Sequence, residues 1–179
     1  LPYREDDKTA PDTVYGHTKL DGERAVEASG ADYMIIRTSW LYSPFGHNFV
    51  KTMIRLGQEN ESLNVVYDQV GSPTSAHDLA RGVLEIIDKV SSGIYPFVSG
   101  VFHYSNEGVC SWYDFAVAIH KLAGIECAVH PIDTENYPAP AKRPHYSVLN
   151  KQKIKAAYDL EIPHWETSLE LIVNRILNP

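Results

Sequence analysis

The sequence is poor in cysteine and has no long apolar run. Its 179 residues include two cysteines, Cys110 and Cys127, which are too few for a disulfide framework and lack the spacing of a metal site. We therefore expect a reducing, cytoplasmic compartment. The longest apolar runs, such as 33–36, are far shorter than the ~20 residues that cross a bilayer. This excludes a membrane-spanning protein from the expected classes.

Basic residues are also in deficit. There are 16 lysines and arginines against 23 aspartates and glutamates, which gives a formal net charge of −7. This balance disfavours nucleic acid as a partner, because the phosphate backbone is bound mainly by basic side chains. The eight histidines include no His-x-x-x-His pair, so we expect no metal site.

The third absence is a glycine-rich phosphate loop. No Gly-x-Gly-x-x-Gly turn occurs anywhere in the sequence, so the chain carries no dinucleotide fingerprint of its own. It begins at Leu1, without methionine, in a polar segment. We expect a fragment whose upstream part was cut away, lost to proteolysis or not supplied.

What is present indicates an α/β fold. Helix starts, stops and apolar periodicity predict helices at about 12–29, 49–58, 75–90, 111–123, 151–157 and 167–177. Short β-branched or alternating runs predict strands at 33–40, 63–67, 101–105 and 128–132. Strands that alternate with helices are typical of parallel pairing. On the third helix we expect an inward face of Leu79, Val83, Ile86, Ile87 and Val90.

The segment with the clearest chemistry is Tyr15-x-x-x-Lys19 on the first helix. Positions i and i+4 lie on one helix face, so the phenol and the ammonium point the same way. A nearby cation stabilises a phenolate, which makes the phenol a better proton donor to a carbonyl oxygen that receives hydride. Eleven tyrosines in this sequence make about half of one such pair expected by chance, so the motif needs context. Gly16 and Gly22 on this helix indicate close approach by a ligand or another element.

That context comes from four further motifs in a fixed order. Residues 13–23 resemble the active-site helix of the extended short-chain dehydrogenases/reductases. Residues 37–42, 48–53, 68–74 and 138–144 follow as they do in the dTDP-4-dehydrorhamnose reductase branch of that family. Ser72-Pro73-Thr74 stands where related epimerases and dehydratases usually carry an Arg-Asp-Phe type of stretch, which favours the reductase branch.

The resemblance implies roles for individual residues. Tyr15 matches the proton donor, and Lys19 matches the lysine that holds the nicotinamide ribose and stabilises the phenolate. Trp40 matches the tryptophan that lies against the sugar, although a packing role in the core is the simpler interpretation from the residue alone. Asn48 and Arg143 are further candidates for binding the nucleotide-sugar. Their alternatives are a helix cap and a solvated loop charge.

The resemblance also implies a division of the chain and a cofactor. Residues 1–40 would be the trailing part of an NAD(P)-binding Rossmann domain. Residues 41–179 would form mainly the smaller α/β nucleotide-sugar domain, with about 76–105 returning to the Rossmann sheet. The cofactor would be NADPH or NADH. Because the phosphate loop is missing, the fragment alone is expected to be inactive.

The implied partner is a dTDP-sugar, whose C4 ketone would be reduced to give dTDP-L-rhamnose. A homodimer is one possible assembly. Two alternatives remain open. One is another nucleotide-sugar epimerase or dehydratase with the same fold. The other is a non-catalytic relative that regulates methionine adenosyltransferase.

Overall fold

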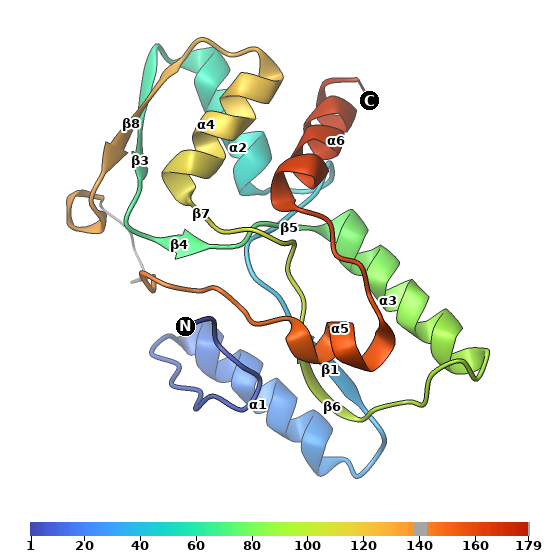
Figure 1. Ribbon diagram of the computed structural model, residues 1–179. Coiled ribbons are helices and arrows are strands. Elements are labelled where there is room, and N and C mark those ends of the chain that lie inside the picture. Colours follow the sequence, from blue (N-terminus) through green and yellow to red (C-terminus); the bar gives the residue numbers. More distant parts are fainter. Residues whose placement is uncertain (138–142, 179) are drawn as a thin grey trace.

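The chain alternates helices with short strands, as a computed structural model of residues 1–137 and 143–178 describes it (Figure 1). The helices are α1 (Val14–Ala28), α2 (Phe49–Glu59), α3 (Ala76–Ser91), α4 (Trp112–Ala123), α5 (Gln152–Tyr158) and α6 (Trp165–Leu177), with a 3₁₀ turn η1 (Thr134–Asn136). The strands are β1 (Met34–Arg37), β2 (Leu41–Tyr42), β3 (Ser62–Val66), β4 (Val70–Gly71), β5 (Thr74–Ser75), β6 (Gly100–His103), β7 (Cys110–Ser111) and β8 (Ala128–Ile132). No helix within these residues is both long and apolar enough to cross a bilayer.

The helices begin where polar side chains satisfy the free amide groups of the first turn. Thr13, Asn48, Ser75 and Ser111 each accept a hydrogen bond from a backbone N–H in the turn that follows. At the other end of α4, Gly124 takes the left-handed conformation, with φ +64°, which stops the helix. The predicted starts of α1 and α4 and the stop of α4 are therefore confirmed.

The strands pair mainly in parallel, as predicted for an α/β fold. Among the described residues β1 pairs with β6, β2 with β5 and β3 with β8 in parallel, whereas β4 pairs with β7 in antiparallel orientation. In the first pair Met34 lies opposite Gly100 and Arg37 opposite His103. The long connection through α3 thus returns the chain to the strand that follows α1.

Apolar side chains form two clusters. The first joins α2, α4 and α6 to β3 and is centred on residues such as Val50, Phe115 and Leu169, which are at most 1% exposed. The second joins β6, α3 and α5 and includes Phe102 and Tyr158, both fully buried. In Figure 1 the first cluster lies in the upper part of the molecule and the second in the lower part.

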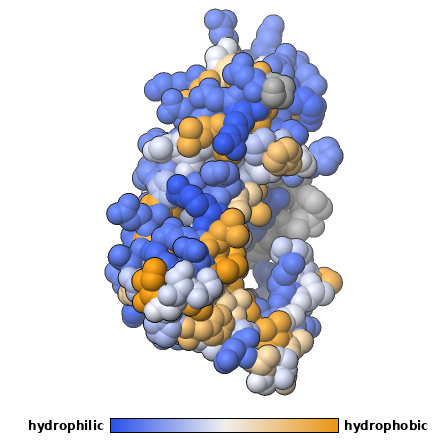
Figure 2. Space-filling view, turned by 90° about the vertical axis from the view of Figure 1, so that its right-hand side faces the viewer, coloured by the Kyte–Doolittle hydropathy of each residue, from blue (hydrophilic) through white to orange (hydrophobic). Residues whose placement is uncertain are grey.

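One expectation about packing is wrong. Ile87 was predicted to face inward, yet it is 57% exposed beside Leu84, which is 65% exposed, because the buried stripe of α3 follows Ile86 instead. Figure 2 shows hydrophobic patches in the lower half of the face that carries α3. Tyr104, which follows β6, belongs to the second cluster.

A buried polar network joins the segment after β6 to the starts of α3 and α6. Asn106 is fully buried. Its Oδ1 accepts from the Ser75 N–H at 2.7 Å, and its Nδ2 donates to the Asp78 carboxylate at 2.8 Å and to the Pro163 carbonyl at 3.1 Å. The hydroxyl of Ser168 on α6 also donates to Asp78, at 2.5 Å. Because every partner is itself polar and enclosed, this network fixes how three segments meet.

Candidate active site and nucleotide-sugar site

Tyr15 and Lys19 lie on an exposed face of α1. The Tyr15 side chain is 72% exposed, and the Lys19 Nζ atom lies 5.3 Å from the centroid of its ring. The expected proximity of the pair is thus confirmed, in a geometry where the cation faces the ring of the phenol. Both groups are accessible to a ligand from solvent.

The entry of α1 is tight at one of its two glycines. A Cβ at Gly16 would lie 2.9 Å from the Cβ of Pro11 and 3.3 Å from Oγ1 of Thr13. Glycine therefore lets the preceding segment fold back against the helix that carries Tyr15. Gly22, which was expected to be approached closely as well, has nothing within 4 Å, so that interpretation is not supported.

An ion pair ties α1 to β1. The Arg37 guanidinium donates to both carboxylate oxygens of Glu23, at 2.8 and 2.6 Å, and the two side chains are only 23% and 17% exposed. The hydrogen bond to Glu23 raises the pKa of Arg37, which its partial burial alone would lower. This bidentate contact fixes how α1 lies along the strand.

A cavity of about 490 Å³ runs beside α1. Lys19 and Glu23 line one side of it, Thr38 and Ser39 follow from the end of β1, and residues 144–149 contribute to the lining as well. Its volume lies within the usual range for small-ligand sites. The cavity therefore places the Lys19 ammonium beside the segment that leads from β1 to Trp40.

His103 lies at the inner wall of this cavity and is 1% exposed. Its Nδ1 lies 3.2 Å from the Tyr3 carbonyl oxygen, and its backbone N–H donates to Glu5 at 3.0 Å. Nε2 is buried without a partner among the described residues. Burial lowers the pKa of His103, against the opposing charge of Glu5. This histidine is thus held neutral at the joint between the first residues and β6.

Trp40 has a strained backbone and a half-buried side chain. Its φ is +49°, a left-handed value that is uncommon outside glycine and asparagine. Its indole stacks on that of Trp112 with centroids 3.6 Å apart and planes 9° from parallel. A Cβ at Gly71 would lie 2.5 Å from the Trp40 ring, so the glycine makes room for the indole.

Trp112 also contacts Arg143, another of the predicted substrate residues. The Arg143 guanidinium carbon lies 5.9 Å from a Trp112 ring centroid, and Phe49 packs on the same indole at 4.6 Å. The contact of Trp112 with Trp40 is long-range, and no local pattern in the sequence signals it.

Asn48 acts as a helix cap. Its Oδ1 accepts from the Lys51 N–H at 3.2 Å, and its Nδ2 donates to the carbonyls of Ser43 and Phe45, at 2.8 and 3.3 Å. The cap alternative from the sequence is therefore the role seen. These bonds occupy both ends of the amide and hold the 43–48 turn.

Arg143 precedes a segment whose position is fixed by backbone pairing with Val70. His145 accepts from the Val70 N–H at 2.8 Å through its carbonyl, and the Ser147 N–H donates to the Val70 carbonyl at 2.9 Å. The Arg143 side chain itself is exposed. Residues 138–142, which belong to the late proline-rich motif, lie outside the described residues.

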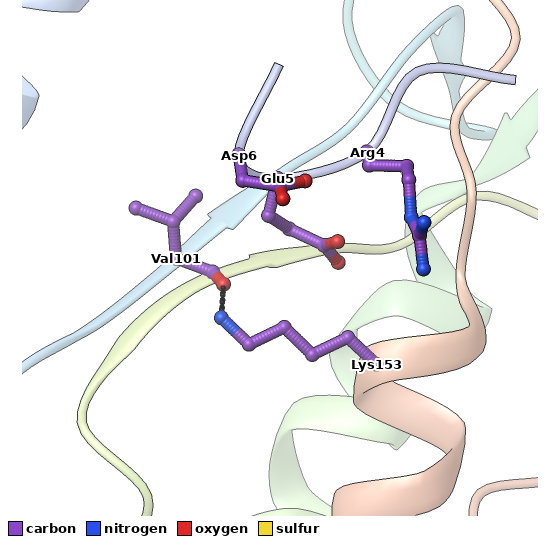
Figure 3. Close-up of a pocket in the computed structure, with 5 residues that line it drawn as sticks. All are labelled: Arg4, Glu5, Asp6, Val101 and Lys153. Carbon is purple, nitrogen blue, oxygen red and sulfur yellow. Dashed lines mark hydrogen bonds between the residues drawn. The ribbon is translucent and has the colours of Figure 1, made fainter.

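A separate cavity of about 520 Å³ lies on the other side of the first residues. Figure 3 shows Arg4, Glu5 and Asp6 beside Val101 of β6 and Lys153 of α5. The Lys153 Nζ donates to the Val101 carbonyl at 2.6 Å. This cavity contains none of the predicted site residues, and its lysine is bound to the strand. In the described part of the chain, no group of three or more His, Cys, Asp or Glu side chains is arranged to hold a metal.

The fold and this site define a class of protein. An extended short-chain dehydrogenase/reductase has three of these features: parallel α/β pairing, a Tyr-x-x-x-Lys helix along a cavity, and an aromatic wall after the next strand. In this chain the aromatic wall is Trp40 stacked on Trp112. The model of the family described as RmlD substrate binding domain matches residues 1–178. The chain belongs to this family.

Named relatives agree with the resemblance found in the sequence. The chain is 41% identical to a dTDP-4-dehydrorhamnose reductase of Sinorhizobium fredii over 99% of its own length and 61% of the relative's. It superposes on the crystal structure of a dTDP-4-dehydrorhamnose reductase from Clostridium acetobutylicum with a TM-score of 0.88 and 45% identity, covering 99% of this chain and 60% of that one. A dTDP-4-dehydrorhamnose reductase from Bacillus anthracis, in complex with NADP, gives a TM-score of 0.87 and 40% identity, covering 97% and 59%. The chain thus spans about three fifths of the length of these relatives.

Proposed function

We propose that this chain supplies the Tyr15–Lys19 pair and the sugar-nucleotide site of an NAD(P)H-dependent dTDP-4-dehydrorhamnose reductase. The observation that carries the proposal is the exposed Tyr15, with Lys19 at 5.3 Å from its ring centroid, on a helix beside a cavity in a chain of this family. Members of the family named as this reductase support the substrate class.

The cofactor would meet the chain at α1. NAD(P)H supplies hydride when bound, and NADP in the Bacillus anthracis relative supports this choice. The accessible Lys19 ammonium, 5.3 Å from the centroid of the Tyr15 ring, is suited to hold a ribose hydroxyl. The Tyr15 hydroxyl would give its proton to the sugar O4 as the ketone is reduced to an alcohol.

The sugar nucleotide would lie along the aromatic wall. Trp40 offers an indole face of the kind that packs against sugars, and Arg143 offers a guanidinium suited to two diphosphate oxygens. For Asn48 the proposal is indirect: it holds the 43–48 turn through its three hydrogen bonds. The intended substrate is dTDP-4-dehydro-L-rhamnose.

The division into two domains is part of the proposal. The second apolar cluster, which contains β6 and α3, supports assigning 1–40 and 76–105 to the cofactor side. It also draws 152–162 to that side, because Ile154 and Tyr158 pack in the same cluster. The first cluster would be the core of the sugar-nucleotide side.

A cytoplasmic location is supported by the free thiols of the chain's two cysteines. A homodimer remains a prediction, which light scattering would test.

The test is turnover of dTDP-4-dehydro-L-rhamnose by the intact protein that contains this chain, followed as NADPH consumption. Tyr15→Phe should lower kcat by about 10²–10⁴-fold, the usual contribution of a positioned general acid. Tyr95→Phe, in the second cluster, is the matched control and should leave kcat unchanged. Normal turnover by the Tyr15→Phe protein would refute the role of Tyr15. Product formation only from UDP- or GDP-sugars would refute the substrate.

A further inference from the structure

Trp112 contacts both Trp40 and Arg143, the aromatic and the basic candidates for binding the nucleotide-sugar. It stands in the first turn of α4 and is half-buried. Its contact with Trp40 is intimate, at 3.6 Å between centroids and 9° between planes. The Arg143 contact, at 5.9 Å, is near the outer limit of a cation–π interaction. The contact with Trp40 is therefore the stronger of the two, and we expect Trp112 to act through it.

The Trp40 side chain needs outside support to keep its orientation. A left-handed residue that is not glycine persists only when its surroundings over-determine it, and Trp40 has φ +49°. The backbone is fixed by the Thr74 N–H, which donates to the Trp40 carbonyl at 3.1 Å. The indole is confined at its edge by Gly71, where even a Cβ would lie within 2.5 Å. The Trp112 stack lies parallel to the ring and holds its plane.

We propose that Trp112 is a positioning residue: its indole holds Trp40 in the one plane that packs against the sugar of the bound nucleotide-sugar. This inference rests on the proposed function, in which Trp40 contacts the sugar. A ring already fixed in the bound orientation loses less conformational entropy when the ligand arrives. A leucine at position 112 would leave the Trp40 ring free to turn about its side-chain bonds, and binding would then have to order it.

The experiment measures dTDP-L-rhamnose affinity by calorimetry for wild type, Trp112→Leu, Trp40→Ala and the double variant. Trp112→Leu should weaken binding roughly tenfold. The double variant should bind no more weakly than Trp40→Ala alone, because Trp112 acts through Trp40. Tyr113→Leu is the matched control: it is the next residue of α4, packs against the same cluster, and should bind as wild type does.

A second measurement reports the ring itself without ligand. The ¹⁵N order parameter of the Trp40 indole N–H should fall in Trp112→Leu and stay unchanged in Tyr113→Leu. If Trp112→Leu does not fold, Trp112→Phe keeps an aromatic face and should show a two- to threefold loss with the same non-additivity.

The outcomes separate this inference from the function beneath it. Wild-type affinity and an unchanged Trp40 order parameter in Trp112→Leu would overturn the positioning role and leave the reductase proposal standing. A double variant that loses the full product of the two single effects would also overturn it. A wild-type protein that does not bind dTDP-L-rhamnose would overturn both.

Discussion

Asn106→Ala tests whether the buried polar network joins the two halves of the molecule. The substitution leaves the buried Ser75 N–H, now accepted at 2.7 Å, without an acceptor. The Pro163 carbonyl loses one donor and keeps the Glu107 N–H at 2.9 Å, and the Asp78 carboxylate loses one donor and keeps the Ser168 hydroxyl. An unsatisfied buried polar group costs about 1–3 kcal/mol. With one such group and two partly compensated acceptors, we expect a loss of about 2–3 kcal/mol in the free energy of unfolding.

The assay is urea unfolding followed by circular dichroism. With a slope of about 2 kcal/mol per molar urea, that loss lowers the midpoint by roughly 1–1.5 M. The lost free energy is a large part of the ~5–15 kcal/mol that stabilises an ordinary domain. Asn64→Ala, at an exposed position of β3, is the control and should stay within about 0.5 kcal/mol of wild type. A loss below about 1 kcal/mol for Asn106→Ala would refute the reasoning, because water would then replace the lost partners.

Three further predictions concern the site. Gly71→Ala should displace the Trp40 ring, because the new Cβ would lie 2.5 Å from it. Binding of dTDP-L-rhamnose, measured by calorimetry, should weaken roughly tenfold, in line with the ~1–3 kcal/mol that overpacking costs. Unchanged affinity would contradict this prediction. Burial lowers the pKa of His103 in the folded state, so below about pH 6.5 the unfolded chain binds more protons than the folded one, and stability falls as the pH falls. The urea midpoint should therefore vary less with pH in His103→Gln than in wild type. The same pH profile in both proteins would contradict this assignment. Glu23→Gln should cost about 1–2 kcal/mol, because Arg37 loses a charged partner in a partly exposed pair; an unchanged thermal midpoint would show that the pair contributes nothing.

The helices were predictable because their determinants are local. Ser111 and Gly124 start and stop α4 through contacts within a few residues, so the sequence contains the whole signal. The two-residue strands β2, β4, β5 and β7 were missed, because a segment so short has no periodicity to detect. Their pairing depends on partners about 30 to 40 positions away.

The site divides in the same way. The proximity of Tyr15 and Lys19 follows from helix geometry and was predictable. The stack of Trp40 on Trp112 was not, because it depends on how α4 packs against a loop 72 positions earlier. Asn48 left two alternatives open in the sequence, and only its three hydrogen bonds select the cap. The order of the motifs indicated the family, but it gave no information about the contacts between the motifs.

The helix that carries Tyr15 and Lys19 has none of its residues buried, which has a consequence for its dynamics. Apart from the Arg37 pair with Glu23 and the contact at Gly16, little in the described structure restrains α1. Its amide protons should therefore exchange with solvent through local opening well before those of α4, which is built into a core. A ligand that spans Lys19 and the aromatic wall would slow exchange along α1, so part of its binding energy would go into ordering this helix.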